Sequence, residues 1–414
     1  MLPWAGSVPH AKATDGQYEF KGREMMTTRS YHFVDSDTHL TEPADVWTSR
    51  VPAKWKDKVP NVRWVNEGKS QCWFIGDEQM YGVGSSANAG WPEPFPSHPP
   101  TYEAAHPASY DASARLKYMD SVGCWAQVVY PNIGGFGSQS FLKMGDPELM
   151  LACVEAYNDF QRDWAAPDPR RFVTMIALPF WNIEQAVKEV ERSAKKGHRG
   201  ILFTAAPQDY GLPVLADRYW DPLWQVAQDH DLPISFHIGS GDFMDEAKDN
   251  YTAKRLKADG MSVTYARTTT NLLLGNAMQL GDLLLSGVLP RYPNLKFVSV
   301  ESGIGWIPFL LESTDYHFKA ADVRGSRPEF TMLPSEYFRR QVYGCYWFEK
   351  GVSDELLRKV GVDKIMFETD FPHVTCLYGN IDESIEEGIG DKSDAVKRRI
   401  LFDNCAELYK IELN

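Results

Sequence analysis

The feature that most constrains the fold is a regular alternation of short apolar segments and segments with helical spacing. Eight apolar segments predict strands, at 31–34, 126–131, 172–178, 200–203, 233–237, 295–301, 341–345 and 364–370. Helical spacing is found at 112–122, 147–165, 183–196, 218–230, 265–286, 306–319, 354–360 and 393–409. Such alternation predicts a parallel sheet, and eight units favour a closed (β/α)8 TIM barrel, an α/β fold, over an open sheet.

The chain is long enough for one large barrel domain. Of its 414 residues, a (β/α)8 barrel needs about 250, so we expect a single domain over 31–414 with a long insertion after the first strand, at 44–111. Residues 91–100 are too rich in proline for a helix or a central strand. Residues 70–81 predict a hairpin with Gly76-Asp77 as its turn. Long insertions are often lids, although a solvated or dimer-covering insertion explains this one equally well.

Charge and composition exclude several classes of protein. The net charge of −13 argues against nucleic-acid binding, which needs a basic face. No stretch approaches the roughly 20 apolar residues of a membrane span, and the polar segment 1–30 does not resemble a signal peptide. We expect that segment to be an arm or to be disordered. The six scattered cysteines indicate free thiols in a reducing compartment, so we expect a cytoplasmic protein.

Side chains that can bind a metal stand where four of the predicted strands end. In a barrel these ends meet at the face that carries the active site. The first strand leads into Asp37 and His39, which are two residues apart and therefore point the same way in an extended segment. The complete set is Asp37, His39, His237, Glu301, Asp370 and His373.

Each of these residues has a plainer explanation when it is taken alone. His237 resembles a structural histidine with a satisfied hydrogen bond, Glu301 a helix-capping residue, and Asp370 the start of a turn. Their joint occurrence at the expected strand ends favours a site for a divalent metal, Zn²⁺ first and Mn²⁺ as the alternative. His98 and His106, in the proline-rich part of the insertion, are candidate lid residues.

The chain from residue 34 onward resembles the amidohydrolase-related family typified by aminocarboxymuconate semialdehyde decarboxylase. The matching pieces include Val-Asp-Ser-Asp-Thr-His-Leu-Thr-Glu-Pro at 34–43, Pro-Ile-Ser-Phe-His-Ile-Gly at 233–239 and Met-Phe-Glu-Thr-Asp-Phe-Pro-His at 366–373. Tyr-Pro-Asn-Leu-Lys-Phe-Val at 292–298 and Asn-Cys-Ala-Glu-Leu-Tyr at 404–409 complete the set. The resemblance implies a barrel with one divalent metal, and a homodimer. By motif position it implies the metal ligands Asp37, His39, His237 and Asp370.

One position departs from that family. In the decarboxylase and many relatives, strand six ends in a histidine that acts as general acid and base, whereas 300–303 here reads Val-Glu-Ser-Gly. A carboxylate can also move a proton when burial raises its pKa towards neutrality. We therefore take Glu301, Asp370 and His373 as the candidate catalytic residues.

These features lead to three hypotheses for function. The absent histidine favours a metal-dependent hydrolase acting on an amide, lactone, ester or carbon–carbon bond of a small carbonyl compound. The alternative is a metal-dependent, non-oxidative decarboxylase of an aromatic or unsaturated acid. A metal-free binding protein is the third, although every ligand position is filled. Trp73, Trp91 and Phe95 in the insertion suggest that the small-molecule substrate is aromatic or cyclic.

Overall fold

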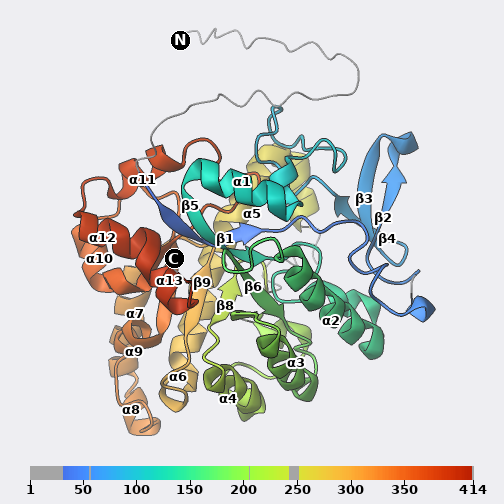
Figure 1. Cartoon of the computed structure of the whole chain (residues 1–414). Coiled ribbons are helices and arrows are strands. Elements are labelled where there is room, and N and C mark those ends of the chain that lie inside the picture. The colour runs from blue at the N-terminus through green and yellow to red at the C-terminus, as the bar shows by residue number, and fades with distance from the viewer. Residues whose placement is uncertain (1–30, 56, 205, 242–250, 413–414) are drawn as a thin grey trace.

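The computed structural model describes residues 31–412 apart from 56, 205 and 242–250, so the arm predicted over 1–30 lies outside the described residues. A closed barrel of parallel strands forms the centre, in the order β1-β11-β10-β9-β8-β7-β6-β5 (Figure 1). This confirms the predicted (β/α)8 barrel. The barrel strands are β1 (Phe33–His39), β5 (Cys124–Tyr130), β6 (Phe172–Ala177), β7 (Gly200–Leu202), β8 (Ile234–His237), β9 (Phe297–Val300), β10 (Val342–Tyr346) and β11 (Ile365–Phe367).

The barrel closes between its first and last strands. Asp35 of β1 pairs with Phe367 of β11, and β1 pairs on its other side with β5. Two hydrogen bonds continue this contact beyond the strands. The amide of Asp370 donates to the carbonyl of Asp37 at 3.0 Å, and the amide of His39 donates to the carbonyl of Phe371 at 2.7 Å. The first and last candidate site residues are therefore held together by backbone.

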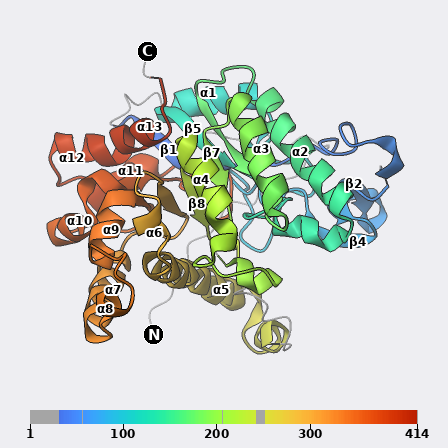
Figure 2. The ribbon, with the colours of Figure 1, turned by 90° about the horizontal axis from the view of Figure 1, so that it is seen from below.

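Helices surround the strands, as the view in Figure 2 shows. The helices at 147–164, 183–195 and 221–229 are amphipathic, since their apolar residues recur at helical spacing and form the buried face. The α-helices are α1 (Ala112–Val122), α2 (Pro147–Trp164), α3 (Ile183–Lys195), α4 (Asp221–Asp229), α5 (Tyr251–Leu285), α6 (Val288–Arg291), α7 (Ile307–Ala320), α8 (Val323–Ser326), α9 (Pro334–Gln341), α10 (Asp354–Val360), α11 (Ile381–Ile389), α12 (Asp394–Arg398) and α13 (Asn404–Leu408).

Helix α5 differs most from its prediction. It begins at Tyr251 rather than at residue 265, with a break in helical geometry at Gly260, whose φ is +76°. Most residues from 254 to 263 are exposed, so this part has no apolar face for sequence periodicity to reveal. Further along the helix, Leu280, Leu283 and Leu284 are buried in the core, whereas Leu274 is 53% exposed.

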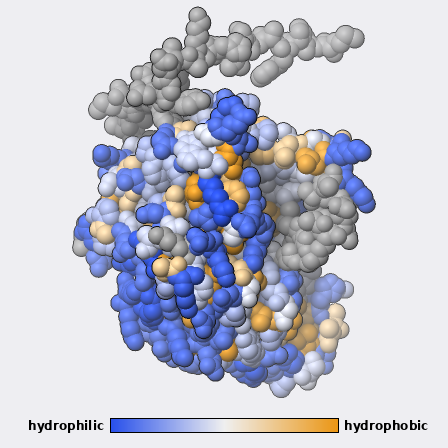
Figure 3. All heavy atoms as spheres, turned by 90° about the vertical axis from the view of Figure 1, so that its right-hand side faces the viewer, coloured by the Kyte–Doolittle hydropathy of each residue, from blue (hydrophilic) through white to orange (hydrophobic). Residues whose placement is uncertain are grey.

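The insertion forms a small antiparallel sheet beside the barrel, at the right of Figure 1. The predicted hairpin is present as β3 (Ser70–Ile75) and β4 (Glu78–Gly82), and β2 (Asn61–Val65) adds a third strand that was not predicted. The face of the molecule on this side is mainly hydrophilic, with apolar residues in scattered spots (Figure 3).

Two buried tryptophans join the insertion to the barrel. The ring of Trp73 packs edge-on against Trp47 at 5.6 Å, and the indole of Trp47 donates to the carbonyl of Cys153 in α2 at 3.0 Å. Trp73 is 1% exposed, so the suggestion that it contacts a substrate is wrong: it belongs to the core. Among the described residues, no helix is both long and apolar enough to cross a membrane.

Candidate active site

Six side chains from four parts of the chain converge at the carboxyl end of the barrel. Asp37 and His39 lie in β1, and His237 is the last residue of β8. Glu301 directly follows β9, whereas Asp370 and His373 lie in the segment after β11. Five of the six are buried, and His373 is partly buried. The structure thus brings together all the residues that the strand-end argument selected.

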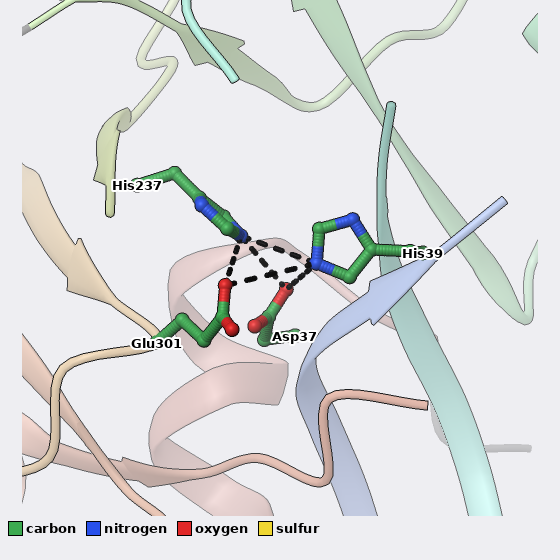
Figure 4. A group of neighbouring side chains, drawn as sticks. All are labelled: Asp37, His39, His237 and Glu301. Atoms are coloured by element: carbon green, nitrogen blue, oxygen red, sulfur yellow. Dashed lines mark hydrogen bonds and ion pairs between the residues drawn. The ribbon is translucent and has the colours of Figure 1, made fainter. Parts of the chain in front are cut away.

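The ligand atoms of Asp37, His39, His237 and Glu301 surround one point (Figure 4). His237 Nε2 lies 3.2 Å from both His39 Nε2 and Glu301 Oε2. Asp37 Oδ1 lies 3.5 Å from His39 Nε2 and 3.6 Å from His237 Nε2. Ligands bound tetrahedrally at about 2.1 Å from an ion stand about 3.4 Å apart. These separations therefore suit a single divalent ion.

Asp370 belongs to a second, overlapping group with His39, Glu301 and His373. Its Oδ1 lies 3.6 Å from His39 Nε2 and 2.7 Å from His373 Nδ1. Sequence reasoning made Asp370 the fourth ligand and Glu301 a proton carrier. In the structure Glu301 groups with the other three predicted ligands, and Asp370 stands between His39 and His373.

The hydrogen bonds of the two inner histidines prepare them to bind a cation. His39 Nδ1 faces the carbonyl of Pro131 at 3.1 Å, and His237 Nδ1 faces the carbonyl of Ile238 at 2.8 Å. Since a carbonyl only accepts, each Nδ1 carries the hydrogen, and each Nε2 presents a lone pair to the centre. Both oxygens of Asp37 and Oε2 of Glu301 are buried without a hydrogen-bond donor. Such a set of acceptors fits a metal ion.

Burial and mutual repulsion shift the ionisation of these groups. Burial, with the nearby Asp370, raises the pKa of Glu301 well above its usual range, and burial together with Asp37 does the same for Asp370. Burial lowers the pKa of His39, and it lowers that of His373 to about 4. Burial also opposes the charge on His237, but Asp37 and Glu301 outweigh it and raise its pKa. The cluster is therefore rich in acceptors and poor in positive charge.

Two acidic residues hold unusual backbone conformations that aim them into the site. Glu301 has φ +54° and Asp370 has φ +60°, a left-handed region that costs a non-glycine residue about 1–2 kcal/mol. The amide of Glu301 donates to Oε2 of Glu368 at 3.1 Å, and that of Asp370 donates to Asp37, as described above. Glu368 is fully buried. It is a site residue that sequence reasoning missed.

Asn132 is another missed residue. His373 Nε2 lies 2.9 Å from Asn132 Oδ1, and the amide nitrogen of Asn132 donates to the carbonyl of Leu40 at 3.0 Å. The side-chain Nδ2 of Asn132 is held by the carbonyl of Leu40, so the side-chain Oδ1 is the atom that faces His373. Asn132 therefore orients the His373 ring. Asn132 lies two residues beyond the end of β5, so the strand-end rule used for the other residues was sufficient to find it.

A pocket of about 430 Å³ opens above the cluster. Glu301 and His373 form part of its lining, and four aromatic residues form other parts: Tyr81 and Phe95 of the insertion, Phe136 and Tyr265. The ring of Phe136 lies 4.3 Å from that of His237. His98 also lines the pocket, whereas the side chain of His106 caps a short helical turn by accepting from the amide of Ala108. Mixed aromatic and polar walls suit a small organic ligand.

Comparisons with known proteins found related sequences. A family model described as amidohydrolase matches residues 137–411. A gamma-resorcylate decarboxylase of Polaromonas sp. is 27% identical over 305 residues, which cover 72% of this chain and 86% of that protein. A 2-amino-3-carboxymuconate-6-semialdehyde decarboxylase of Dictyostelium discoideum is 22% identical over 276 residues, covering 65% of this chain and 69% of that protein.

Solved structures share the fold. The crystal structure of an amidohydrolase from Mycobacterium avium subsp. paratuberculosis aligns with a TM-score of 0.72 at 23% identity, over 92% of this chain and 99% of that one. A dihydroxybenzoic acid decarboxylase from Polaromonas sp., solved with manganese and the inhibitor 2-nitroresorcinol, aligns with a TM-score of 0.60 at 17% identity. That alignment covers 92% of this chain and 98% of the decarboxylase.

Proposed function

Because this chain belongs to the amidohydrolase family, we propose that it is a metal-dependent enzyme that removes carbon dioxide from an aromatic carboxylic acid. Hydrolysis, which the sequence favoured, becomes the second candidate. The curated relatives described above are both named decarboxylases. The observation that carries the proposal is the inner end of the pocket, where aromatic walls meet Glu301, His373 and the ligand cluster.

The chain supplies a fitting place for the ion. Asp37, His39 and His237 would hold it, with Glu301 as the fourth ligand and Asp370 alongside. A divalent ion there would fix and polarise the oxygen atoms of a bound acid. Two imidazoles and several carboxylates, with no thiolate, suit either Zn²⁺ or Mn²⁺.

The reaction needs one proton. The bond between the ring carbon and the carboxylate breaks, its electron pair stays on the ring carbon, and a proton forms the new carbon–hydrogen bond. We assign this proton to Asp370, whose pKa is raised by burial and by the nearby Asp37. His373 is neutral and its Nε2 donates to Asn132 Oδ1, so its Nδ1, 2.7 Å from Asp370 Oδ1, accepts from the protonated carboxyl and holds it in place. Phe136, beside His237, offers a face for the aromatic ring.

Hydrolysis of an ester, lactone or amide is the second candidate because of Glu301. This residue stands where the resembling decarboxylases have a histidine, and a buried carboxylate can accept a proton from water. The same pocket would then bind a cyclic carbonyl compound.

One experiment separates the two activities. The purified protein, loaded with Mn²⁺ or with Zn²⁺, is incubated with a panel of hydroxybenzoic acids, gamma-resorcylate included, and released carbon dioxide is measured. A parallel panel holds aryl esters, lactones and amides. We expect carbon dioxide release that stops with a chelator and returns with the metal. Hydrolysis without carbon dioxide release would overturn the proposal in favour of the second candidate.

A further inference from the structure

The pocket is larger than a single aromatic ring requires. Its volume is about 430 Å³, whereas an apolar cavity of about 150 Å³ is enough to bind benzene. A large part of the lining belongs to the insertion, at 81–98, and to helix α5, at 265–272. We call the space between these two segments the outer part of the pocket, and a benzoic acid bound at the ligand cluster would leave it unused.

The outer part has aromatic and aliphatic walls. The rings of Phe95 and Tyr265 lie 4.4 Å apart, with 35° between their planes, and both residues line the pocket. Thr269 and Leu272 follow Tyr265 by one and two turns of α5, so a single face of the helix is turned towards the pocket. Such walls suit the flat faces of a second ring.

The outer part is polar without being charged. Among the lining residues that the structure describes, none is a lysine or an arginine, and Glu301 at the inner end is the only aspartate or glutamate. Asn88 also lines the pocket, and its Nδ2 donates to the carbonyl of Ser97 at 3.3 Å. Its Oδ1 is buried and has no donor within the described part of the chain. That oxygen suits a neutral donor such as a phenol hydroxyl.

We propose that the substrate is an aromatic acid with two rings, one carrying the carboxyl group at the ligand cluster and the other, uncharged, lying in the outer part beside Phe95 and Tyr265. The inference rests on the proposed function for the position of the carboxyl group. A second acidic group on the outer ring would meet no cation among the described lining residues, in a chain whose net charge is −13.

Three acids test the inference with the Mn²⁺-loaded protein: salicylate, 4-phenylsalicylate, and 4-phenylsalicylate with a carboxylate on the outer ring. Calorimetry measures Kd, and release of carbon dioxide measures kcat and KM. Burying the second ring is expected to lower Kd about tenfold or more. Because that ring is bound equally before and during the reaction, KM falls with Kd and kcat stays within about twofold. The added carboxylate is expected to abolish the gain.

Variants of the outer part locate the second ring. Phe95→Ala is expected to remove most of the preference for 4-phenylsalicylate and to leave the Kd of salicylate within about twofold. Tyr265→Ala changes the other ring of the pair and is expected to do the same. Trp64→Ala is the matched control, since it removes a ring that is 58% exposed and that belongs to the same insertion but not to the pocket lining. It is expected to keep the wild-type preference.

The outcomes separate this inference from the proposed function. Equal Kd values for salicylate and 4-phenylsalicylate, or weaker binding of the larger acid, would overturn the inference even if salicylate releases carbon dioxide. A preference that survives in both Phe95→Ala and Tyr265→Ala, or equally tight binding of the acid with two carboxylates, would also overturn it. Tighter binding of 4-phenylsalicylate without carbon dioxide release from any acid would instead overturn the proposed function and leave the two-ring preference intact.

Discussion

At the scale of single residues, Glu301 is the side chain whose place in the structure differs most from its predicted role. Its sequence position suggested a substitute for a catalytic histidine, yet its Oε2 lies among the ligand atoms, 3.2 Å from His237 Nε2. The left-handed backbone at this position explains the difference. Alternation along a strand predicts where side chains point only while the strand continues, and Glu301 lies just beyond the end of β9.

Glu301→Gln tests this geometry. The amide is a poorer ligand than the carboxylate for a divalent ion, so we expect both weaker metal binding and a loss of turnover of about 10²-fold or more. Metal content after dialysis and kcat at saturating metal are the measurements. Glu103→Gln, the same change at an exposed site in the insertion, is the control. Unchanged metal content together with lost turnover would assign Glu301 to proton transfer alone.

Glu42 provides a pH-dependent test of stability. It is fully buried, accepts from the amides of Asn132 and Ile133 at 2.8 and 3.1 Å, and burial raises its pKa to about 7. The unfolded chain loses this proton near its ordinary pKa of about 4.3. The folded state thus binds more protons between these values, and stability falls as pH rises through that range.

Glu42→Gln removes this dependence. Relative to the wild type, its free energy of unfolding is expected to rise by about 3 kcal/mol between about pH 4.5 and about pH 7.5. Urea unfolding of the chelated proteins at both pH values measures it. A constant difference between the two proteins across this range would contradict a raised pKa in the folded state.

At the scale of elements, the pattern of apolar residues predicted the buried strands of the barrel better than the exposed elements. All eight barrel strands were predicted from short apolar runs, although β1 continues beyond the predicted 31–34 through the polar residues 35–39. Strand β2 and helices α9 and α11 were missed, as was the start of α5. Strand β2 lacks fully buried residues, and the first part of α5 is mostly exposed.

Trp73 shows how the insertion depends on the core. Trp73→Ala is expected to lower the free energy of unfolding by about 3–5 kcal/mol, since it empties a buried site against Trp47. Trp64→Ala makes the same change on neighbouring β2, where the ring is 58% exposed, and is expected to cost less than about 0.5 kcal/mol. Denaturant unfolding measures both. Equal losses of unfolding free energy in the two variants would show that burial of the ring does not determine the effect of removing it.

At the scale of the whole molecule, the ligand cluster links metal binding to stability. Asp37, Glu301 and Asp370 are buried acids, and an ion bound among them favours the folded state by about 2.7 kcal/mol at a concentration 100 times its Kd. We expect a chelator to lower the Tm and Mn²⁺ or Zn²⁺ to restore it. The His39→Ala and His237→Ala double variant lacks two ligands, so its Tm should not respond. An equal response in that variant would place the ion elsewhere.

Assembly also belongs to this scale. The homodimer that the family resemblance implied stays a prediction. Exposed apolar residues lie on neighbouring parts of α5 and α7, among them Met278, Phe309 and Tyr316. Analytical ultracentrifugation of the wild type measures the molecular mass, and a monomer over the micromolar range would contradict the prediction.

The pairing of β1 with β11 has a consequence for how this protein is made. Asp37 emerges early in synthesis and Asp370 near its end, and the backbone bond between them forms only when the ring of strands is complete. A nascent chain still short of β11 lacks Asp370 and the strand that closes the barrel around the ligand cluster. We therefore expect tight binding of a divalent ion to follow docking of the last strand, after translation rather than during it.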